Sequence, residues 1–353
     1  MNLVSIRGRG AAENAPNRFE ALWCVPDADV RDPDDPGPRT LFFRDSSRSI
    51  IARNNSPDVG FTFSINPYRG CEHGCVYCYA RPTHEYLGFS AGLDFETRIL
   101  VKQDAPELLR RELSSRRWVP DTIAISGVTD CYQPVERRLE LTRRCLEVLV
   151  EFRNPAAVIT KNHLVTRDVD LLGELAAHHA ALVFLSVTTL DPKLQQVMEP
   201  RTSIPARRLD AIRQLSEAGI PVGVMVAPVI PGLTDHELPA ILDEAKAAGA
   251  RLAGYVPLRL PLGVAPLFED WLERHFPERR DRVLNRLREI RGGKLNDARF
   301  RTRMRGEGVY AEHLRSLFQL ACRRAGMNQE PLHLSSAAFR RPDPAGQIGL
   351  FGS

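Results

Sequence analysis

Three cysteines close together are the residues of this 353-residue chain with the clearest capacity for chemistry. Cys71, Cys75 and Cys78 lie in the stretch INPYRGCEHGCVYCYARP, residues 65–82, with the spacing Cys-x3-Cys-x2-Cys. Four thiolates would close a structural zinc site or an electron-transfer iron–sulfur site. Three thiolates leave one iron of a 4Fe-4S cluster free to take a small-molecule ligand. The spacing therefore predicts a cluster with one open coordination position.

A zinc site is the alternative for these cysteines. His73 or His84 would then have to supply the fourth ligand, and His73 lies inside the loop, where reaching the same metal is sterically awkward. No second Cys-x-x-Cys pair occurs elsewhere in the sequence, as a closed zinc site would favour. We therefore prefer the iron–sulfur interpretation.

The composition is that of an ordinary globular protein, with 43% hydrophobic and 26% charged residues. The net charge of +4 is too small to argue for nucleic acid by itself. The N-terminus lacks the apolar core of a signal peptide, and no run approaches the roughly 20 apolar residues of a membrane span. We expect a cytoplasmic protein without a membrane partner, in a compartment where clustered cysteines more often bind metal than form disulfides.

Short apolar, β-branched runs alternate with helical patterns over much of the chain. Such runs predict strands buried on both faces, and their spacing is typical of βα units. The apolar runs begin at residues 122, 156, 181, 221 and 251, and a β-like run at 59–65 precedes the cysteines. The helical patterns cover residues 136–152, 167–179, 205–219 and 234–250. Six units are too few for a closed eight-unit barrel, so we predict an α/β fold with a partial, open (βα)6 barrel of the TIM type. Its chemistry should lie at the carboxyl ends of the strands.

The sequence divides into four parts on this interpretation. Residues 1–58 are expected to form a partly disordered extension, because 26–40 is rich in Pro and Asp and lacks apolar periodicity. Residues 59–265 form the barrel core, 266–330 a helical and basic C-terminal extension, and 331–353 a flexible tail.

The cysteine motif resembles that of the radical S-adenosylmethionine (SAM) superfamily, through GCEHGCVYC with the aromatic Tyr77 before the third cysteine. Between about residues 61 and 260 the chain resembles the DNA-repair-photolyase-type branch, which includes spore photoproduct lyase. The segments that carry this likeness are 127–147, VITKN (158–162), LSVTTLD (185–191) and 198–237. The resemblance implies a 4Fe-4S cluster on the three cysteines and SAM bound at its free iron. It implies cleavage of SAM to a 5'-deoxyadenosyl radical that abstracts hydrogen from a substrate. A flavodoxin- or ferredoxin-type reductant would be a partner.

The resemblance also implies which residues hold SAM, and Tyr77 is counted among them. In this branch a lysine and a serine at the ends of adjacent strands contact the carboxylate end of SAM, and Lys161 and Ser186 match them. A lysine suits this role as a point-charge donor, although a surface lysine at a strand end is the plainer alternative. Thr129 and Asp130 match a Ser-Asp pair, and the Asp130 carboxylate could accept a hydrogen bond from the SAM ammonium.

Three more residues fall near the predicted catalytic rim. Glu199 and Arg201 match a segment that often contacts ribose or carboxylate, with a structural ion pair as the alternative. Cys131 is a candidate hydrogen donor, because a thiol S–H bond is weak enough to quench a carbon radical. The donor cysteine of spore photoproduct lyase matches about Gly127 or Val128 instead, so we do not identify the chain with that enzyme. A small loop residue is the alternative for Cys131.

Two features of the C-terminal part point to macromolecular partners. Residues 291–305, RGGKLNDARFRTRMR, interleave basic residues with Phe300 and Met304, which is typical of a nucleic-acid-facing strip or of a solvated surface. Gln347–Phe351, QIGLF, resembles the peptide with which bacterial DNA polymerases and repair proteins dock on the sliding clamp. Packing of this peptide against the barrel is the alternative.

Three functions remain open from the sequence. The first is a radical SAM enzyme that acts on DNA or another nucleic acid, as a lyase or in repair or modification. The second is a radical SAM enzyme that modifies a protein, peptide or metabolite. The third is a non-catalytic iron–sulfur sensor, which would have no need of Lys161 and Ser186. The sequence does not name the substrate, because a family likeness fixes chemistry better than it fixes specificity.

Overall fold

The computed structural model describes residue 6, residues 8–19 and residues 39–342. Its main sheet has the strand order β10-β9-β8-β7-β6-β3-β2. Neighbouring strands pair in parallel, except that β2 (Ala52–Arg53) and β3 are antiparallel. The parallel strands are β3 (Phe63–Ile65), β6 (Ile123–Ile125), β7 (Ala156–Thr160), β8 (Ala181–Ser186), β9 (Val222–Val229) and β10 (Leu252–Pro257). These six correspond to the six predicted runs, and the open (βα)6 barrel is confirmed.

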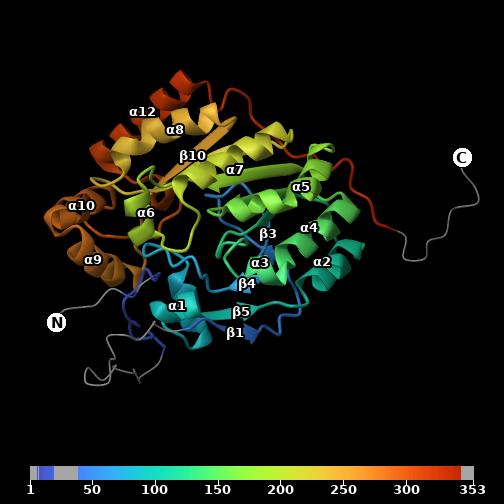
Figure 1. The fold of residues 1–353 in the computed structure, drawn as a ribbon, viewed down its shortest axis with the longest axis horizontal. Helices are drawn as coiled ribbons and strands as arrows, with labels where there is room; N and C mark the ends of the chain where they lie inside the picture. The colour runs from blue at the N-terminus through green and yellow to red at the C-terminus, as the bar shows by residue number, and fades with distance from the viewer. Residues whose placement is uncertain (1–5, 7, 20–38, 343–353) are drawn as a thin grey trace, which may run out of the picture.

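Helices follow the strands as expected for βα units, and Figure 1 shows them along the outer side of the main sheet. They are α2 (Ala105–Ser114), α3 (Glu136–Leu139), α4 (Leu141–Phe152), α5 (Val169–Ala176), α6 (Pro192–Met198), α7 (Pro205–Glu217) and α8 (Leu238–Ala247). Short 3-10 helices also occur between the strands: η2 (Arg81–Leu87), η3 (His163–Asp168) and η4 (Asp235–Glu237). The predicted helix 136–152 is divided, because Glu140 takes a left-handed conformation with φ of 51°.

The C-terminal extension is helical, as predicted, and packs beside the end of the barrel. It contains α9 (Val264–His275), α10 (Pro277–Ile290), α11 (Thr302–Arg305) and α12 (Gly308–Ala325). The helical pattern at 266–290 is split at Pro277, whose missing N–H suits the first turn of a new helix. Trp271, Phe268 and Leu284 are fully buried in the core between α9, α10 and the barrel. Burial of each such side chain stabilises the fold by roughly 1.5–3 kcal/mol.

A second, three-stranded sheet was not predicted. It has the order β1-β5-β4 and consists of β1 (Leu41–Arg44), β5 (Arg98–Val101) and β4 (Tyr68–Arg69). A short helix, α1 (Leu93–Thr97), leads directly into β5. Strand β1 lies inside the segment predicted as a partly disordered extension, so residues 41–44 belong to an ordered part of it. Its partner β5 lies more than 50 residues away in sequence, so no local pattern announces the pairing.

Part of the segment predicted as a flexible tail, residues 331–342, has contacts with the barrel. The amide of Ser335 donates to the carbonyl of His179, and that of Arg340 to the carbonyl of Phe152, both at 2.9 Å. The Phe339 ring packs against Phe152, with 6.2 Å between ring centroids. The predicted clamp peptide Gln347–Phe351 lies outside the described residues.

The outer edge of β10 is covered by the turn after α12. The amide of Asn328 donates to the carbonyl of Arg251 at 3.0 Å. Its side chain accepts from the amide of Ala253 at 2.8 Å and donates to the carbonyl of the same residue at 3.0 Å. One asparagine thus satisfies three backbone groups that a further strand would otherwise pair.

The helices of the described residues include none that is both long and apolar enough to cross a membrane.

Candidate functional site

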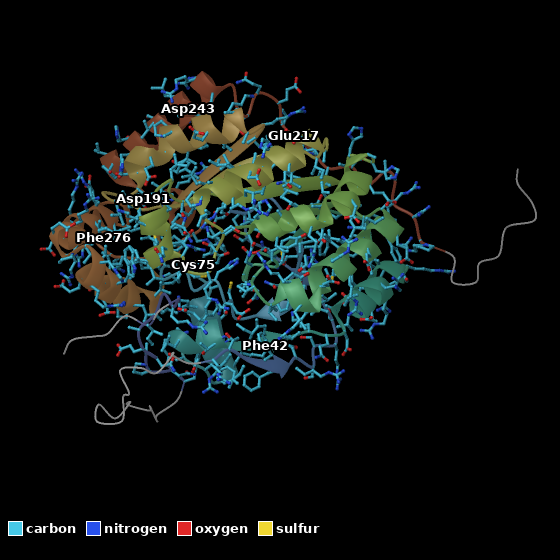
Figure 2. The ribbon with its side chains drawn as sticks, viewed as in Figure 1. Phe42, Cys75, Asp191, Glu217, Asp243 and Phe276 are labelled. Atoms are coloured by element: carbon cyan, nitrogen blue, oxygen red, sulfur yellow. The ribbon has the colours of Figure 1, made fainter. Side chains whose placement is uncertain are left out.

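The three cysteines of the sequence motif lie on one wall of a cavity of about 280 Å³. The other walls come from the carboxyl ends of the parallel strands: residues 126–130 after β6, 159–161 at the end of β7, Ser186 of β8, 225, 227 and 228 of β9, and 256–259 at the end of β10. This is the edge at which barrels of this type place their chemistry. Cys75 lies near the middle of the view in Figure 2, whereas Glu217 and Asp243 lie toward the outer helices.

The cysteine loop is held from behind by a buried ion pair. Arg81 and Glu96 are both fully buried, with 2.6 Å between Nη2 and Oε1. Arg81 also donates to the carbonyls of Cys75, Ala91 and Gly92 at 2.9–3.2 Å. An ion pair without water is favourable only when the remaining donors and acceptors are satisfied, and here they are. The loop is therefore held in one conformation.

The N-terminal segment completes this support. The amides of Gly10 and Ala11 donate to the Glu96 carboxylate at 3.2 and 2.9 Å. A Cβ at Gly10 would lie 1.8 Å from the carbonyl oxygen of Gly74 in the cysteine loop, so only glycine permits this approach. Gly74 itself has a φ of 67°. Residues 8–19 are thus an ordered part of the predicted N-terminal extension and support the cysteine loop.

The three thiols form no disulfide with any described residue. All three cysteines are free, and burial is the main cause that raises the pKa of each thiol above its usual value. Among the described residues, no three His, Cys, Asp or Glu side chains converge on a point where they could hold one metal ion. In a 4Fe-4S cluster each cysteine binds a different iron, so its ligands need not converge on a single ion.

The two histidines that a zinc site would need have other partners. The Nδ1 of His73 lies 3.4 Å from Oδ2 of Asp130, and its Nε2 lies 3.2 Å from the side-chain nitrogen of Asn162. The Nε2 of His84 lies 2.9 Å from the carbonyl oxygen of Arg98. Burial lowers the pKa of His84 to about 4, which fits a neutral structural histidine. The geometry therefore favours the cluster over the zinc alternative.

Lys161 and Ser186 reach the cavity as the sequence predicts. The Lys161 ammonium lies 3.0 Å from the carbonyl oxygen of Ala227 and 3.5 Å from Oε1 of Glu199. Burial lowers its pKa from 10.5 to about 8, against the opposing influence of Cys75. Ser186 lines the cavity, and within the described part of the chain its hydroxyl has no hydrogen-bond partner. Both groups are available to a ligand, and Lys161 is not a surface lysine.

Asp130 lines the cavity, but its carboxylate is already fully used. Oδ1 accepts from Thr160 at 2.7 Å and from the amide of Tyr132 at 2.9 Å. Oδ2 accepts from the amide of Lys161 at 2.7 Å and faces His73. Although burial opposes it, this set of donors, His73 first, lowers the pKa of Asp130. Asp130 therefore joins the ends of β6 and β7 to the cysteine loop.

Two other predicted residues have structural partners of their own. Thr129 lines the cavity, but its hydroxyl donates to the carbonyl of Tyr68 at 3.0 Å. Tyr77 also lines the cavity, with its hydroxyl on Glu199 and its ring centroid 5.9 Å from the Lys161 ammonium. Both shape the wall and leave direct ligand contact chiefly to Lys161 and Ser186.

Glu199 does not line the cavity, contrary to its predicted contact with a ligand. It is fully buried, and its carboxylate accepts from Tyr77, Arg208 and Thr188. Burial is the main cause that raises its pKa. Because it also faces the Lys161 ammonium, Glu199 positions the lysine from behind.

Arg201 and Cys131 are likewise absent from the cavity wall. Arg201 pairs with Glu72 of the cysteine loop at 3.2 Å, which is the ion-pair alternative considered from the sequence. Cys131 is fully buried in the barrel core, and its Sγ lies 3.9 Å from the carbonyl oxygen of Ile125. Burial raises the pKa of this thiol well above its usual value. The structure does not bring Cys131 to where a hydrogen donor would act.

Sequence reasoning missed two residues at the cavity. Tyr79 is 46% exposed, and its hydroxyl donates to the carbonyl of Gly127. The guanidinium of Arg259 lies over its ring, 4.7 Å from the centroid. The position of Tyr79 directly after Cys78 was a usable signal. Arg259 offered none, because it is one of many arginines and only the fold brings it to the cysteines.

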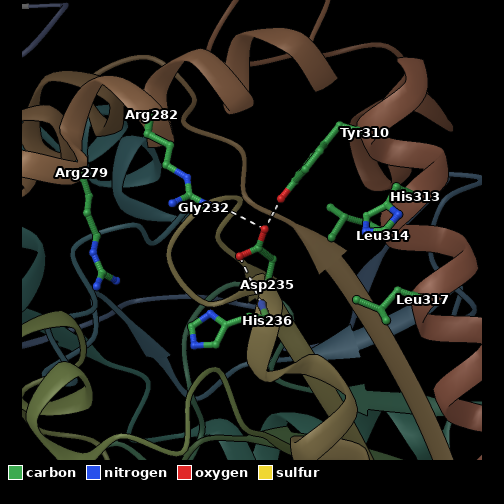
Figure 3. A pocket seen from close by; sticks show the side chains of 9 residues that line it. All are labelled: Gly232, Asp235, His236, Arg279, Arg282, Tyr310, His313, Leu314 and Leu317. Atoms are coloured by element: carbon green, nitrogen blue, oxygen red, sulfur yellow. Dashed lines mark hydrogen bonds between the residues drawn. The ribbon is translucent and has the colours of Figure 1, made fainter.

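A second hollow, of about 430 Å³, lies between the loop after β9 and helices α10 and α12. Figure 3 shows Arg279 and Arg282 on one side and Tyr310 on the other. Its one carboxylate, on Asp235, accepts from the amides of Gly232 and His236 and from the Tyr310 hydroxyl. These bonds fasten the loop to α12. None of the predicted site residues lines this hollow.

Comparison with known sequences agrees with the cysteine motif. The profile of the Radical SAM superfamily matches residues 65–245. An uncharacterized protein of Mycobacterium tuberculosis is 38% identical over 238 residues, which cover 67% of this chain and 69% of that protein. A protein of Pseudomonas phage M6 named radical SAM Nalpha-GlyT isomerase is 25% identical over 56% of this chain and 39% of its own length.

Comparison with solved structures agrees with the fold. A mutant of spore photoproduct lyase superposes with a TM-score of 0.54 and 16% sequence identity, over 80% of this chain and 79% of that one. Spore photoproduct lyase complexed with dinucleoside spore photoproduct gives a TM-score of 0.53 over the same shares of the two chains, also at 16% identity. At this identity the likeness shows a shared architecture.

Proposed function

Because this chain belongs to the radical SAM superfamily, we propose that Cys71, Cys75 and Cys78 hold a 4Fe-4S cluster with SAM bound beside it. The observation that carries this proposal is the common cavity, which unites the three thiols with Lys161 and Ser186. When bound, the cluster and SAM supply a 5'-deoxyadenosyl radical that abstracts a hydrogen atom from the substrate. A flavodoxin- or ferredoxin-type protein is the proposed reductant.

The residues of this chain position the ligand and exclude water. Lys161, held by Glu199 and by the carbonyl of Ala227, offers a buried positive charge to a carboxylate. Ser186 offers a hydroxyl with donor and acceptor capacity. A buried cation and an open hydroxyl opposite three thiols serve an enzyme better than an iron–sulfur sensor. The relative named as an isomerase supports the same choice.

The test is anaerobic reconstitution followed by reduction in the presence of SAM. The wild type should bind about four irons and four sulfides per chain and form 5'-deoxyadenosine. Cys71→Ala, Cys75→Ala and Cys78→Ala should each abolish both, because each removes a thiolate ligand. Cys322→Ala is a matched control, since Cys322 lies on α12 away from the cavity. Tight zinc without iron in anaerobic wild-type protein would contradict the proposal.

We propose a nucleic acid as the substrate, with DNA as the first case. The support is the basic segment 291–305, which reaches the cavity through Met304. A protein, peptide or metabolite substrate is the alternative. Incubation with damaged DNA, RNA and cell extract separates the two, because a true substrate should increase 5'-deoxyadenosine formation.

We also keep the sliding clamp as a proposed partner through Gln347–Phe351. The sequence match is the support for this proposal. A peptide of residues 342–353 should bind purified clamp with a Kd of roughly micromolar, because a short peptide loses conformational entropy on binding. No binding at hundreds of micromolar would contradict it.

A further inference from the structure

One arginine of the cavity that the three cysteines line has no ion pair with any described residue. Arg259 follows β10 and lines the cavity beside Tyr79. Within the described part of the chain, no carboxylate pairs with its guanidinium and no hydrogen bond satisfies it. Burial is the main cause that lowers the pKa of Arg259. Its neighbours are the Tyr79 ring and, at longer range, the Asp58 carboxylate. A half-buried cation without a direct ion pair is costly unless a ligand supplies the missing anion.

Among the described residues, the rest of the cavity wall has no unoccupied carboxylate that would compete with an anionic ligand for Arg259. Among the described residues that line it, Asp130 is the single carboxylate. Its oxygens are already occupied by Thr160, His73 and two backbone amides. The lining cations are Lys161 and Arg259, and Lys161 lies deeper, against Glu199. The cation that remains for the substrate is therefore Arg259.

Aromatic surface stands beside this cation where the cavity opens to solvent. Tyr79 and Val128 line the cavity and are 46% and 48% exposed, so they mark its mouth. Phe61 lines the same cavity. Proteins that bind single-stranded nucleic acids stack bases on exposed aromatic rings and contact phosphates with arginines. Tyr79, with the Arg259 guanidinium on its ring, offers both groups side by side.

The basic segment around α11 is fixed at the same mouth. Arg303 donates to Asp58 and Ser56 at 2.5 Å, which ties α11 to the loop before β3. Met304 thereby lines the cavity. Its neighbours Arg301 and Arg305 are exposed, and their side chains pair with no carboxylate among the described residues. Positive charge thus continues from Arg259 outward along the surface.

We propose that Arg259 and Tyr79 form the entry to a substrate site that takes single-stranded or locally unpaired nucleic acid. One backbone phosphate pairs with Arg259, and the adjacent base lies against the exposed surface of Tyr79. Arg301 and Arg305 contact phosphates further along the strand. This inference rests on the proposed function, since it assigns the substrate of the same cavity. An acidic peptide would also find Arg259, but it would make no use of the ring.

The experiment measures binding of a fluorescein-labelled 16-nucleotide single-stranded DNA of mixed sequence, by anisotropy under anaerobic conditions with reconstituted protein. Arg259→Ala should weaken binding about tenfold, and the slope of log K against log salt should fall by about 0.7, the value for one lost phosphate contact. Arg282→Ala is the matched control. It removes the same charge from the separate hollow of Figure 3, where no described carboxylate pairs with it, and it should change binding less than twofold.

A Tyr79→Leu variant tests the ring, and it should weaken binding about five- to tenfold without changing the salt slope. Labelled polyglutamate serves as the peptide probe and should bind at least tenfold more weakly than the DNA. Equal losses in Arg259→Ala and Arg282→Ala would overturn the inference, as would wild-type protein that binds no DNA. Tight, Arg259-dependent binding of polyglutamate would overturn it in favour of a peptide.

The iron content and SAM cleavage of the wild type are measured in the same preparations. If both are normal while Arg259→Ala leaves the DNA affinity unchanged, the inference fails and the proposed function stands. If the wild type holds no iron, the proposed function fails whatever the DNA result.

Discussion

Arg81 and Arg259 both contact the cysteine loop, but they differ in burial and in their partners. Arg81 is fully buried, pairs with Glu96 and donates to three carbonyls. Arg259 is half-buried, lies on the Tyr79 ring and pairs with no described carboxylate. The back of the loop is thus complete without a ligand, whereas its front leaves donors open. On the proposed function, the loop that would hold the cluster is fixed by the protein alone, and the open donors remain for a molecule that enters the cavity.

The largest expected effect comes from breaking the back of the loop. Arg81→Met leaves the buried Glu96 carboxylate without its cation and should cost about 3–5 kcal/mol of unfolding free energy. Reconstituted iron content should fall with it. Chemical denaturation and iron analysis measure the two effects.

Arg98→Met is the control for this change. Arg98 pairs with Asp94 in the same region, but its side chain is 41% exposed. Loss of that pair should cost less than about 1 kcal/mol. Equal destabilisation by the two substitutions would show that the buried Arg81–Glu96 pair is no more important to the fold than an exposed ion pair.

The next effect concerns Lys161, between the two sides. Lys161→Ala should weaken SAM binding at least about tenfold, or 1.4 kcal/mol. The substitution removes the buried positive charge that is proposed to bind the SAM carboxylate. Iron content should stay near four per chain. Equilibrium dialysis with labelled SAM measures the affinity, and Lys193→Ala on the exposed start of α6 is the control. Loss of the cluster in Lys161→Ala would mean that the lysine supports the loop and not the ligand.

A smaller effect is expected at Cys131. Because this thiol packs in the core, Cys131→Ala should lower stability by about 1 kcal/mol and leave iron content and SAM cleavage as in the wild type. Product analysis with a true substrate then decides the donor hypothesis. An altered product would show that Cys131 reaches the cavity after all.

The smallest effect on stability is expected at Arg259. Arg259→Ala removes a cation that is partly buried without a carboxylate, so the unfolding free energy should change by less than about 0.5 kcal/mol or rise slightly. A loss of more than 2 kcal/mol in denaturant titrations would show that Arg259 is structural, like Arg81.

The sequence predicts the barrel well because parallel strands that are buried on both faces appear in it as continuous apolar runs. The strands at 156–160, 181–186 and 222–229 coincide closely with such runs. The strand pairing of β1 with β5 leaves no such trace, since it joins two four-residue segments far apart in the chain.

The candidate site was predictable where chemistry is carried by a rare residue type. Cysteine clustering identifies the loop, and a lysine among many arginines identifies Lys161. Whether a side chain faces the cavity or the core depends on packing, and this was not visible. The sequence alone therefore does not distinguish Ser186, which lines the cavity, from Cys131 and Glu199, which are buried behind the cavity wall.

The asparagine that covers β10 has a consequence for how copies of this chain meet. An open parallel sheet exposes a row of amides and carbonyls to which a second copy could add its own edge, the usual start of aggregation. Asn328 occupies the amide and carbonyl of Ala253 and the carbonyl of Arg251. These three groups are therefore not free to pair with the edge of a second copy, and a single residue, through its amide and its side chain, covers this stretch of β10.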